Sequence, residues 1–177
     1  NLSIELNNCK IGCNINGTFI YHLMYAYDSC LIAPCPSALQ DLVDICETFA
    51  INSCIVYNAK KCMYFKPPMY KQLYIPPIYL DAKPPVFVEW QKYLGVYINN
   101  YLTDDADIKR QVKAMYVRGN MLLHNFNFCS YNVKQNLFKC YCSNSYGSEL
   151  WSLYKKETYK KCVVAYNDIY RKLFNIR

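Results

Sequence analysis

The chain has 177 residues, which is enough for one domain or two small ones. Hydrophobic residues make up 53% of it and charged residues 19%, a balance that excludes an intrinsically disordered chain. His22 and Asp28 interrupt the longest apolar region, so no run of about 18 uncharged apolar residues exists and we expect no membrane span. The chain starts at Asn1 without a basic and then apolar leader, so we expect a fragment of a longer intracellular protein, nuclear or cytoplasmic.

The net charge of +7 comes from the C-terminal part of the chain. Residues 1–100 contain seven Lys or Arg and seven Asp or Glu, whereas residues 101–177 contain thirteen and six. Such asymmetry predicts a surface that faces a polyanion. A solvated basic face without a partner explains the charge equally well.

The eleven cysteines are an odd number, which argues against a closed set of disulfides. Several occupy positions of the apolar pattern, where a free thiol behaves as a small hydrophobe, and we therefore expect reduced thiols. The tightest spacings are two loose pairs, Cys9 with Cys13 and Cys140 with Cys142. Zinc binding by these pairs is the alternative, but neither has a clear second pair to complete four ligands.

The first part of the chain predicts mixed α and β structure. Residues 10–35 form two or three short strands, with Asn16-Gly17 as one turn and Tyr27-Asp28-Ser29 as the next. Pro36 then opens a helix with Ser37 as its N-cap. The apolar face of this helix is predicted from residues at helical spacing: Leu39, Leu42, Ile45, Cys46 and Phe49.

Further short strands are predicted after this helix. Residues 54–57 and 62–65 form two of them, and prolines confine residues 73–75 and 86–88 to short or edge strands. Residues 93–98 form a better strand that contains Gly95. A glycine inside a strand indicates the close approach of another backbone or a ligand, or simply a bend.

Near residue 100 the apolar period changes from 2 to 3.6, which predicts helices. The first helix is capped by Thr103 or Asp104, the second covers residues 130–142, and the third begins near residue 149 or 158 and ends near 174. The first has a continuous apolar stripe of Ile108, Val112, Met115, Gly119, Leu122 and Phe126. We therefore predict an α+β chain, with a mixed unit over residues 1–100 and a basic helical unit over residues 101–177.

Short motifs follow one another along most of the chain, beginning with Tyr25-Ala26-Tyr27-Asp28 on the second predicted hairpin. The others are Leu31-Ile32-Ala33-Pro34, the helical segment Leu39–Cys46, Asn58 with Lys61 in a turn, Tyr93-Leu94-Gly95, Asp104–Gln111, Val133-Lys134, Leu137-Phe138, Tyr141-Cys142, Tyr146-Gly147, Leu150-Trp151 and Ala165–Asn167. In this order they resemble the C-terminal part of a non-LTR retrotransposon reverse transcriptase, whose hairpin carries Tyr-Ala-Asp-Asp.

This resemblance implies a partial polymerase palm, an antiparallel sheet with a packed helix, followed by an all-helical thumb. The parent enzyme is an RNA-directed DNA polymerase that uses two Mg²⁺ ions, held by carboxylates of the hairpin and of an earlier strand. By resemblance, Asp28 is a catalytic and metal-binding position, Lys61 lies near the phosphates of the incoming nucleotide, and Gly95 lets the backbone approach the primer. Phosphates of RNA or an RNA–DNA hybrid would meet Lys109, Arg110, Lys113 and Arg118, which lie off the apolar stripe.

The sequence departs from the family pattern at Tyr27, which replaces the metal-binding first aspartate of the hairpin. A phenol with a pKa near 10 is neutral at pH 7 and cannot replace a carboxylate. The N-terminal fingers and the earlier catalytic strand of the family are missing from this chain. We therefore expect a catalytically inactive fragment that binds no Mg²⁺.

Blander interpretations of the same residues remain open. Asp28 alone is typical of an Asx-turn residue, and the lysines and arginines of the helix are also typical of a solvated face. One alternative function is a non-enzymatic nucleic-acid-binding module that retains the basic helices. Another is a cysteine-rich structural or zinc protein unrelated to polymerases.

Overall fold

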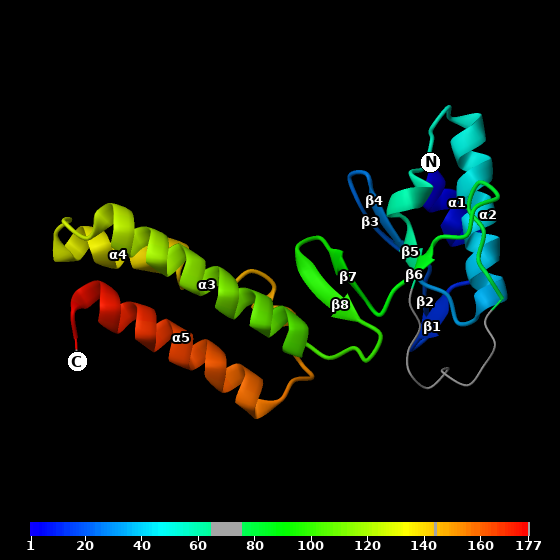
Figure 1. The fold of residues 1–177 in the computed structure, drawn as a ribbon. Coiled ribbons are helices and arrows are strands. Elements are labelled where there is room, and N and C mark those ends of the chain that lie inside the picture. The colour runs from blue at the N-terminus through cyan, green and yellow to red at the C-terminus, as the bar shows by residue number, and fades with distance from the viewer. Residues whose placement is uncertain (65–75, 144, 177) are drawn as a thin grey trace. The chain divides into compact units, whose positions relative to one another are not determined.

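The computed structural model describes residues 1–64, 76–143 and 145–176 (Figure 1). It divides the chain into two compact units, Asn1–Glu89 and Trp90–Arg177. The division falls before the expected one at residue 100, so the segment just after Glu89 belongs with the C-terminal helices. Both units combine helices with paired strands, which confirms the predicted α+β class.

In the first unit, two helices make one core. Helix α1 (Leu2–Asn8), which the sequence did not predict, packs against α2 (Pro36–Asn52), and the buried side chains between them are Leu6, Leu42 and Cys46. The N-cap of α2 is Cys35, not the expected Ser37, because Pro36 occupies the first turn of the helix. Proline suits that position, since it has no N–H to leave unpaired.

The buried face of α2 also differs in part from the predicted stripe. Its fully buried residues are Ala38, Leu42, Val43, Cys46 and Ala50, whereas Leu39, Ile45 and Phe49 are half-buried. The buried face of α2 is rotated from the predicted one because a second core cluster packs Val43 against Ile78 and Leu80 of a later segment. Gln40 fixes that segment by accepting from the Tyr79 amide at 2.8 Å and donating to the Tyr79 carbonyl at 3.0 Å.

Two short hairpins connect α1 to α2. Strands β1 (Cys13–Ile15) and β2 (Thr18–Ile20) are joined by Asn16-Gly17, whose φ angles of 50° and 84° are those of a type I′ turn. The predicted turn is therefore confirmed. Strands β3 (His22–Tyr25) and β4 (Asp28–Leu31) make the second hairpin.

The strands described in the first unit pair only in twos, instead of forming the one packed palm sheet expected from the resemblance. Strands β5 (Met63–Tyr64) and β6 (Val86–Phe87) form a short parallel pair. The predicted strand at residues 54–57 is absent, and that segment runs irregularly into the 3₁₀ turn Ala59–Lys61. The strand predicted at residues 73–75 lies outside the described residues.

The second unit begins with a hairpin of β7 (Trp90–Tyr93) and β8 (Val96–Asn99). The expected single strand over residues 93–98 is wrong, because Leu94 and Gly95 form its two-residue turn with φ angles of 46° and 85°. Leucine rarely occupies that conformation, which explains why the sequence did not indicate a turn there.

Three helices complete the second unit: α3 (Asp105–Phe126), α4 (Tyr131–Tyr141) and α5 (Lys156–Phe174), with a 3₁₀ turn at Ser148–Leu150. Their core contains Met115, Leu122, Phe138, Cys142, Ala165, Ile169 and Leu173, and includes part of the predicted α3 stripe. Figure 1 shows α3 and α5 side by side, running in the same direction. None of the helices in the described part of the chain is long and apolar enough to cross a membrane.

Candidate nucleic-acid interface

The hairpin that carries the Tyr25–Asp28 motif has a two-residue turn. Tyr25 pairs with Asp28, so Ala26 and Tyr27 form the turn, and Asp28 is the first residue of β4. The predicted turn over residues 27–29 is therefore shifted, because Asp28 and Ser29 belong to the strand. Ala26 adopts a φ of 51°, while Tyr27 is fully exposed and Asp28 is exposed.

The groups on this hairpin do not fit a Mg²⁺ site. Mg²⁺ prefers several oxygen ligands in an octahedral arrangement, and the hairpin supplies one carboxylate, that of Asp28. The phenol of Tyr27 beside it is neutral at pH 7. Across the described residues, no three His, Cys, Asp or Glu side chains are grouped so that they could hold a metal ion.

Lys61 lies at the end of the 3₁₀ turn Ala59–Lys61, where the resemblance expects a turn between Asn58 and Lys61. The Lys61 amide donates to the Asn58 carbonyl at 2.8 Å and closes the turn. Lys60 and Lys61 are both exposed. The side chain of Lys61 is thus accessible, on a different element from Asp28.

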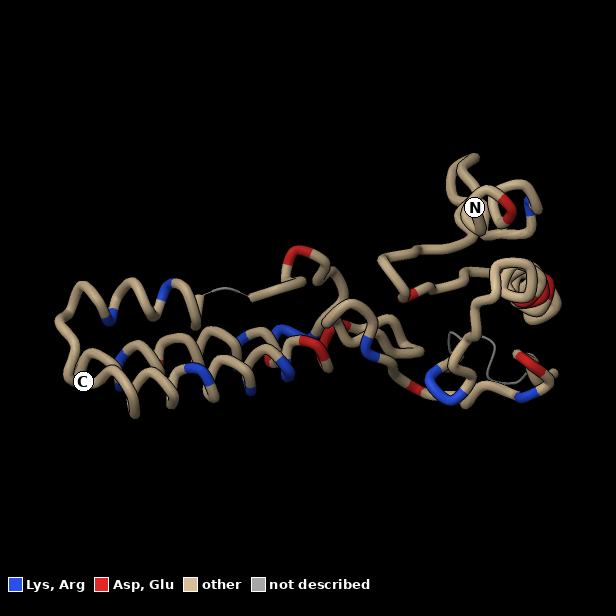
Figure 2. Tube along the Cα trace, turned by 90° about the horizontal axis from the view of Figure 1, so that it is seen from above, with Lys and Arg blue, Asp and Glu red and all other residues tan. Residues whose placement is uncertain are grey.

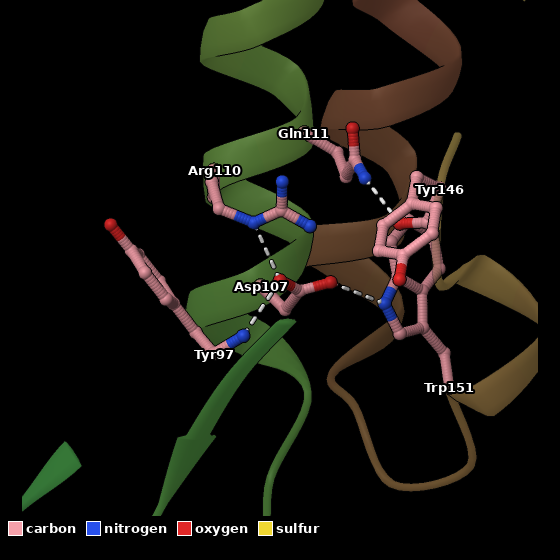
Figure 3. Close-up of polar contacts among 6 residues, drawn as sticks. All are labelled: Tyr97, Asp107, Arg110, Gln111, Tyr146 and Trp151. Carbon is pink, nitrogen blue, oxygen red and sulfur yellow. Dashed lines mark hydrogen bonds and ion pairs between the residues drawn. The ribbon is translucent and has the colours of Figure 1, made fainter. Parts of the chain in front are cut away.

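A buried carboxylate organises the second unit, and the sequence did not indicate its role. Asp107 is fully buried and accepts hydrogen bonds from the Tyr97 amide at 3.0 Å, Arg110 Nε at 2.6 Å and Trp151 Nε1 at 3.0 Å (Figure 3). These donors come from β8, from α3 and from the segment after the 3₁₀ turn at Ser148–Leu150. Asp107 therefore ties three parts of the unit together.

The environment of Asp107 favours its charged form. Burial alone would raise the pKa of this carboxyl, but hydrogen bonds from Arg110, Trp151 and the Tyr97 amide outweigh that effect and hold the pKa below its ordinary value. A carboxylate with three donors is satisfied as an anion. Asp107 is accordingly a structural anchor.

The four basic residues predicted on α3 fall into two classes. Lys109 and Lys113 are exposed and lie one helical turn apart. Arg110 instead pairs with Asp107 and lies over the Tyr97 ring, with its guanidinium carbon 5.8 Å from the ring centre. Arg118 is half-buried, and its charge acts on the buried thiol of Cys142. Only the two lysines present their full charge to solvent.

Gly95 packs against a residue of its own unit. A Cβ placed on Gly95 would lie 3.0 Å from the ring of Tyr146. Gln111 on α3 holds Tyr146 by donating to its carbonyl oxygen at 2.5 Å (Figure 3). The positive φ of the turn and the packing against Tyr146 explain why residue 95 is a glycine, without any ligand approaching the hairpin.

Two more acids at the start of α3 fix the segment that leads into α5. Asp104 Oδ2 accepts from the amides of Ser152 and Leu153, both at 2.7 Å. Asp105 Oδ1 accepts from the Lys155 amide at 3.1 Å. The side-chain hydrogen bond from Thr158 and the bond from Lys155 hold the pKa of Asp105 below its ordinary value. Asp168 also accepts, from the Tyr116 hydroxyl at 3.1 Å, so four of the six acids of the unit accept hydrogen bonds inside it.

The surface charge of the second unit is strongly positive. Residues 90–177 contain fourteen Lys or Arg against six Asp or Glu. Figure 2 shows the basic positions along α3, α4 and α5 instead of on one helix only. Because four of the six acids accept hydrogen bonds inside the unit, few remain to offset the exposed lysines.

Comparison with protein-family models, with curated proteins and with solved structures finds no match for this chain. The functional interpretation therefore depends on the motifs of the chain and on two structural features. These are the Tyr25–Asp28 hairpin of the first unit and the exposed basic surface of the second.

Proposed function

We propose that the chain is part of a reverse transcriptase of the non-LTR retroelement type, that it is inactive as a polymerase, and that its basic helical unit binds an RNA–DNA hybrid. The observation that carries the proposal is the hairpin in which Ala26 and Tyr27 form the turn between Tyr25 and Asp28. It supports the proposal because the Tyr-Ala-Asp-Asp motif needs its two aspartates side by side at the end of a hairpin, and Tyr27 and Asp28 occupy such positions.

The loss of activity follows from the chemistry of those two positions. Two-metal phosphoryl transfer needs carboxylates that bridge both ions, and the hairpin offers Asp28 alone. Tyr27 cannot supply the missing negative charge at neutral pH. The Asp28 carboxylate is left as an exposed surface group.

Binding of the hybrid depends on phosphate contacts from the second unit. Lys109 and Lys113 lie on one face of α3, so both can reach phosphates of the same duplex. Such contacts release counterions and are independent of sequence, and each contributes a slope of about 0.9 to the dependence of log affinity on log salt. The affinity of the full chain should therefore fall steeply as salt rises.

The test is fluorescence anisotropy with a labelled RNA–DNA hybrid over a range of salt concentrations. The double variant Lys109→Gln and Lys113→Gln should bind more weakly and lose roughly 1.8 from the salt slope, because two phosphate contacts are removed. The control is Lys10→Gln with Lys83→Gln, which removes the same charge from exposed positions of the first unit. Equal losses in the two double variants, or binding that ignores salt, would refute the proposed interface.

A second candidate is a nucleic-acid-binding module with no polymerase ancestry. The observation that favours it is that the second unit has its own core, independent of the hairpin motif. The two candidates differ in the ligand preference they predict. The first predicts tighter binding to the hybrid than to double-stranded DNA of the same length. The second predicts equal binding to both. Measuring both ligands in one salt series decides between them.

A further inference from the structure

Two exposed tyrosines stack on each other at the start of α5. The ring centres of Tyr154 and Tyr159 are 5.4 Å apart, and their planes are inclined by 26°. The residues retain 38% and 43% of their exposure. The pair therefore presents aromatic surface to solvent, although neither residue belongs to the α3 positions considered above.

The backbone on both sides of Tyr154 is fixed by α3. The amide of Leu153 donates to Asp104 Oδ2 at 2.7 Å, and the amide of Lys155 donates to Asp105 Oδ1 at 3.1 Å. Thr158, one residue before Tyr159, is buried and also donates to Asp105. The backbone that carries the two rings is thus held before any ligand arrives, which lowers the conformational entropy lost when one binds.

The tyrosine pair is surrounded by positive charge. Four exposed lysines lie between positions 155 and 161, with Glu157 as the one acid in that stretch: Lys155, Lys156, Lys160 and Lys161. Lys155 and Lys156 precede Tyr159 by about one helical turn, which places them on the same side of α5. Lys109 of α3 acts on the same Asp105 carboxylate as Lys155, so the basic surface of α3 continues to this point.

We propose that the Tyr154–Tyr159 pair and its flanking lysines bind an unpaired nucleic-acid strand. One base stacks on the exposed aromatic surface, and the neighbouring phosphates meet Lys155, Lys156 and Lys160. Rigid aromatic rings within a cationic surface suit this ligand, because every base has a π face and every link carries a negative charge. A purely acidic peptide would use the lysines and leave the rings without a partner. The inference does not depend on the polymerase ancestry or on duplex binding by Lys109 and Lys113.

The test compares Tyr159→Leu with Tyr141→Leu in the full chain, using a labelled oligouridine of about ten nucleotides. Tyr141 is a matched control, since it lies on α4 and has a similar exposure, 46% against 43%. Leucine keeps the helix and the apolar contact but removes the π face. We expect roughly tenfold weaker binding for Tyr159→Leu, the scale of one lost base stack, and little change for Tyr141→Leu. Equal affinities of the two variants would overturn the proposal.

An abasic strand of the same length separates stacking from charge. The unaltered chain should bind it more weakly than oligouridine, and Tyr159→Leu should bind both strands equally. Lys156→Gln with Lys160→Gln should weaken binding to both. If the unaltered chain binds the abasic strand, heparin and oligouridine alike, the surface is a general anion site and the proposal is wrong.

Two controls keep the outcomes distinct. Thermal unfolding followed by circular dichroism checks that each variant retains its fold. Hybrid binding by Tyr159→Leu should stay near that of the unaltered chain, whereas the Lys109 and Lys113 double variant should bind the hybrid more weakly. Failure of the single-strand site would then leave the duplex interface untouched, and the reverse also holds.

Discussion

Trp151 Nε1 donates to Asp107 Oδ2 at 3.0 Å and joins two residues 44 positions apart in the sequence. The same carboxylate takes Arg110 from α3 and the amide of Tyr97 from β8. The three donors replace the hydration that the buried anion has lost, so removing one of them leaves part of that cost uncompensated. The side chain of Asp107 therefore joins the β7–β8 hairpin, helix α3 and the segment before α5.

We expect Asp107→Ala to destabilise the second unit by roughly 3–5 kcal/mol, because it leaves Arg110 and two further donors without a partner. Both tryptophans of the chain, Trp90 and Trp151, belong to this unit, so tryptophan fluorescence in urea reports on it alone. Glu149→Ala, which removes an exposed acid, is the control and should change the free energy of unfolding little. A loss no larger than that of the control would show that Asp107 is not the anchor.

The stability of the second unit should fall in acid. Hydrogen bonds hold the pKa values of Asp107 and Asp105 below their ordinary value of about 3.9. The unfolded chain therefore takes up protons first as pH falls, and the stabilisation present above that pH is lost as pH drops through the lower folded pKa values. Urea midpoints by tryptophan fluorescence between pH 7 and 2 test this. Asp107→Asn should flatten the profile, and an unchanged profile would contradict the assignment.

Local patterns predicted those elements whose formation depends on neighbours in the sequence. Asn16-Gly17 was predicted as a turn because both residues tolerate positive φ, and α3 because its apolar stripe repeats at the helical period. The turn at Leu94 was missed because a leucine with positive φ follows no local rule. In the folded unit, Tyr146 packs against Gly95, the second residue of this turn.

The sequence predicts which basic residues α3 carries, but not which of them are free to contact a ligand. The sequence shows that the α3 stripe leaves Lys109 and Arg110 outside it, but not that Arg110 is taken by Asp107. That pairing requires β8 and Trp151, which meet α3 only in the folded unit. The stacked Tyr154–Tyr159 pair was missed for the same reason, since Asp104 and Asp105 meet the backbone beside Tyr154 only in the folded unit.

Gly119 lies at a close contact between α3 and α5. A Cβ at this position would lie 2.4 Å from Ile169 Cγ2, and Ile169 is buried. Alanine normally favours a helix over glycine by about 1 kcal/mol, but overpacking costs about 1–3 kcal/mol. We expect Gly119→Ala to destabilise the unit in urea, and Ile169→Ala, which removes all three contacting carbons, to cost less in the Gly119→Ala variant than in the unaltered chain. Asn120→Ala on the exposed neighbouring position should stabilise instead, and stabilisation by both substitutions would contradict the close contact.

The thiols should differ widely in reactivity. Cys35 is exposed, and hydrogen bonds from the Ser37 side chain, at 3.2 Å, and from the Ala38 amide hold its pKa below the ordinary value. Burial raises the pKa of the Cys46 thiol to about 11. Mass spectrometry after brief iodoacetamide treatment at pH 7.5 should find Cys35 modified several-fold faster than the exposed Cys54, and Cys46 last.

The variant Ser37→Ala removes the side-chain hydrogen bond while leaving the α2 backbone in place, and it should slow the alkylation of Cys35 towards the rate of Cys54. Because only the thiolate reacts, the difference between the two thiols should shrink as pH rises and both become ionised. Equal rates at pH 7.5, or fast modification of Cys46 in the folded chain, would contradict the assignment.

Adding an acid to the hairpin should not give the chain polymerase activity. Tyr27 is fully exposed and contributes no packing, so Tyr27→Asp should leave the fold intact while placing a second carboxylate beside Asp28. Two carboxylates at an exposed turn bind Mg²⁺ weakly, because water still fills most of the positions of its octahedron. Primer extension on an RNA template with Mg²⁺ and labelled deoxynucleotides should therefore give no product with Tyr27→Asp or with its uncharged match Tyr27→Asn. Templated product from Tyr27→Asp but not from Tyr27→Asn would contradict this prediction.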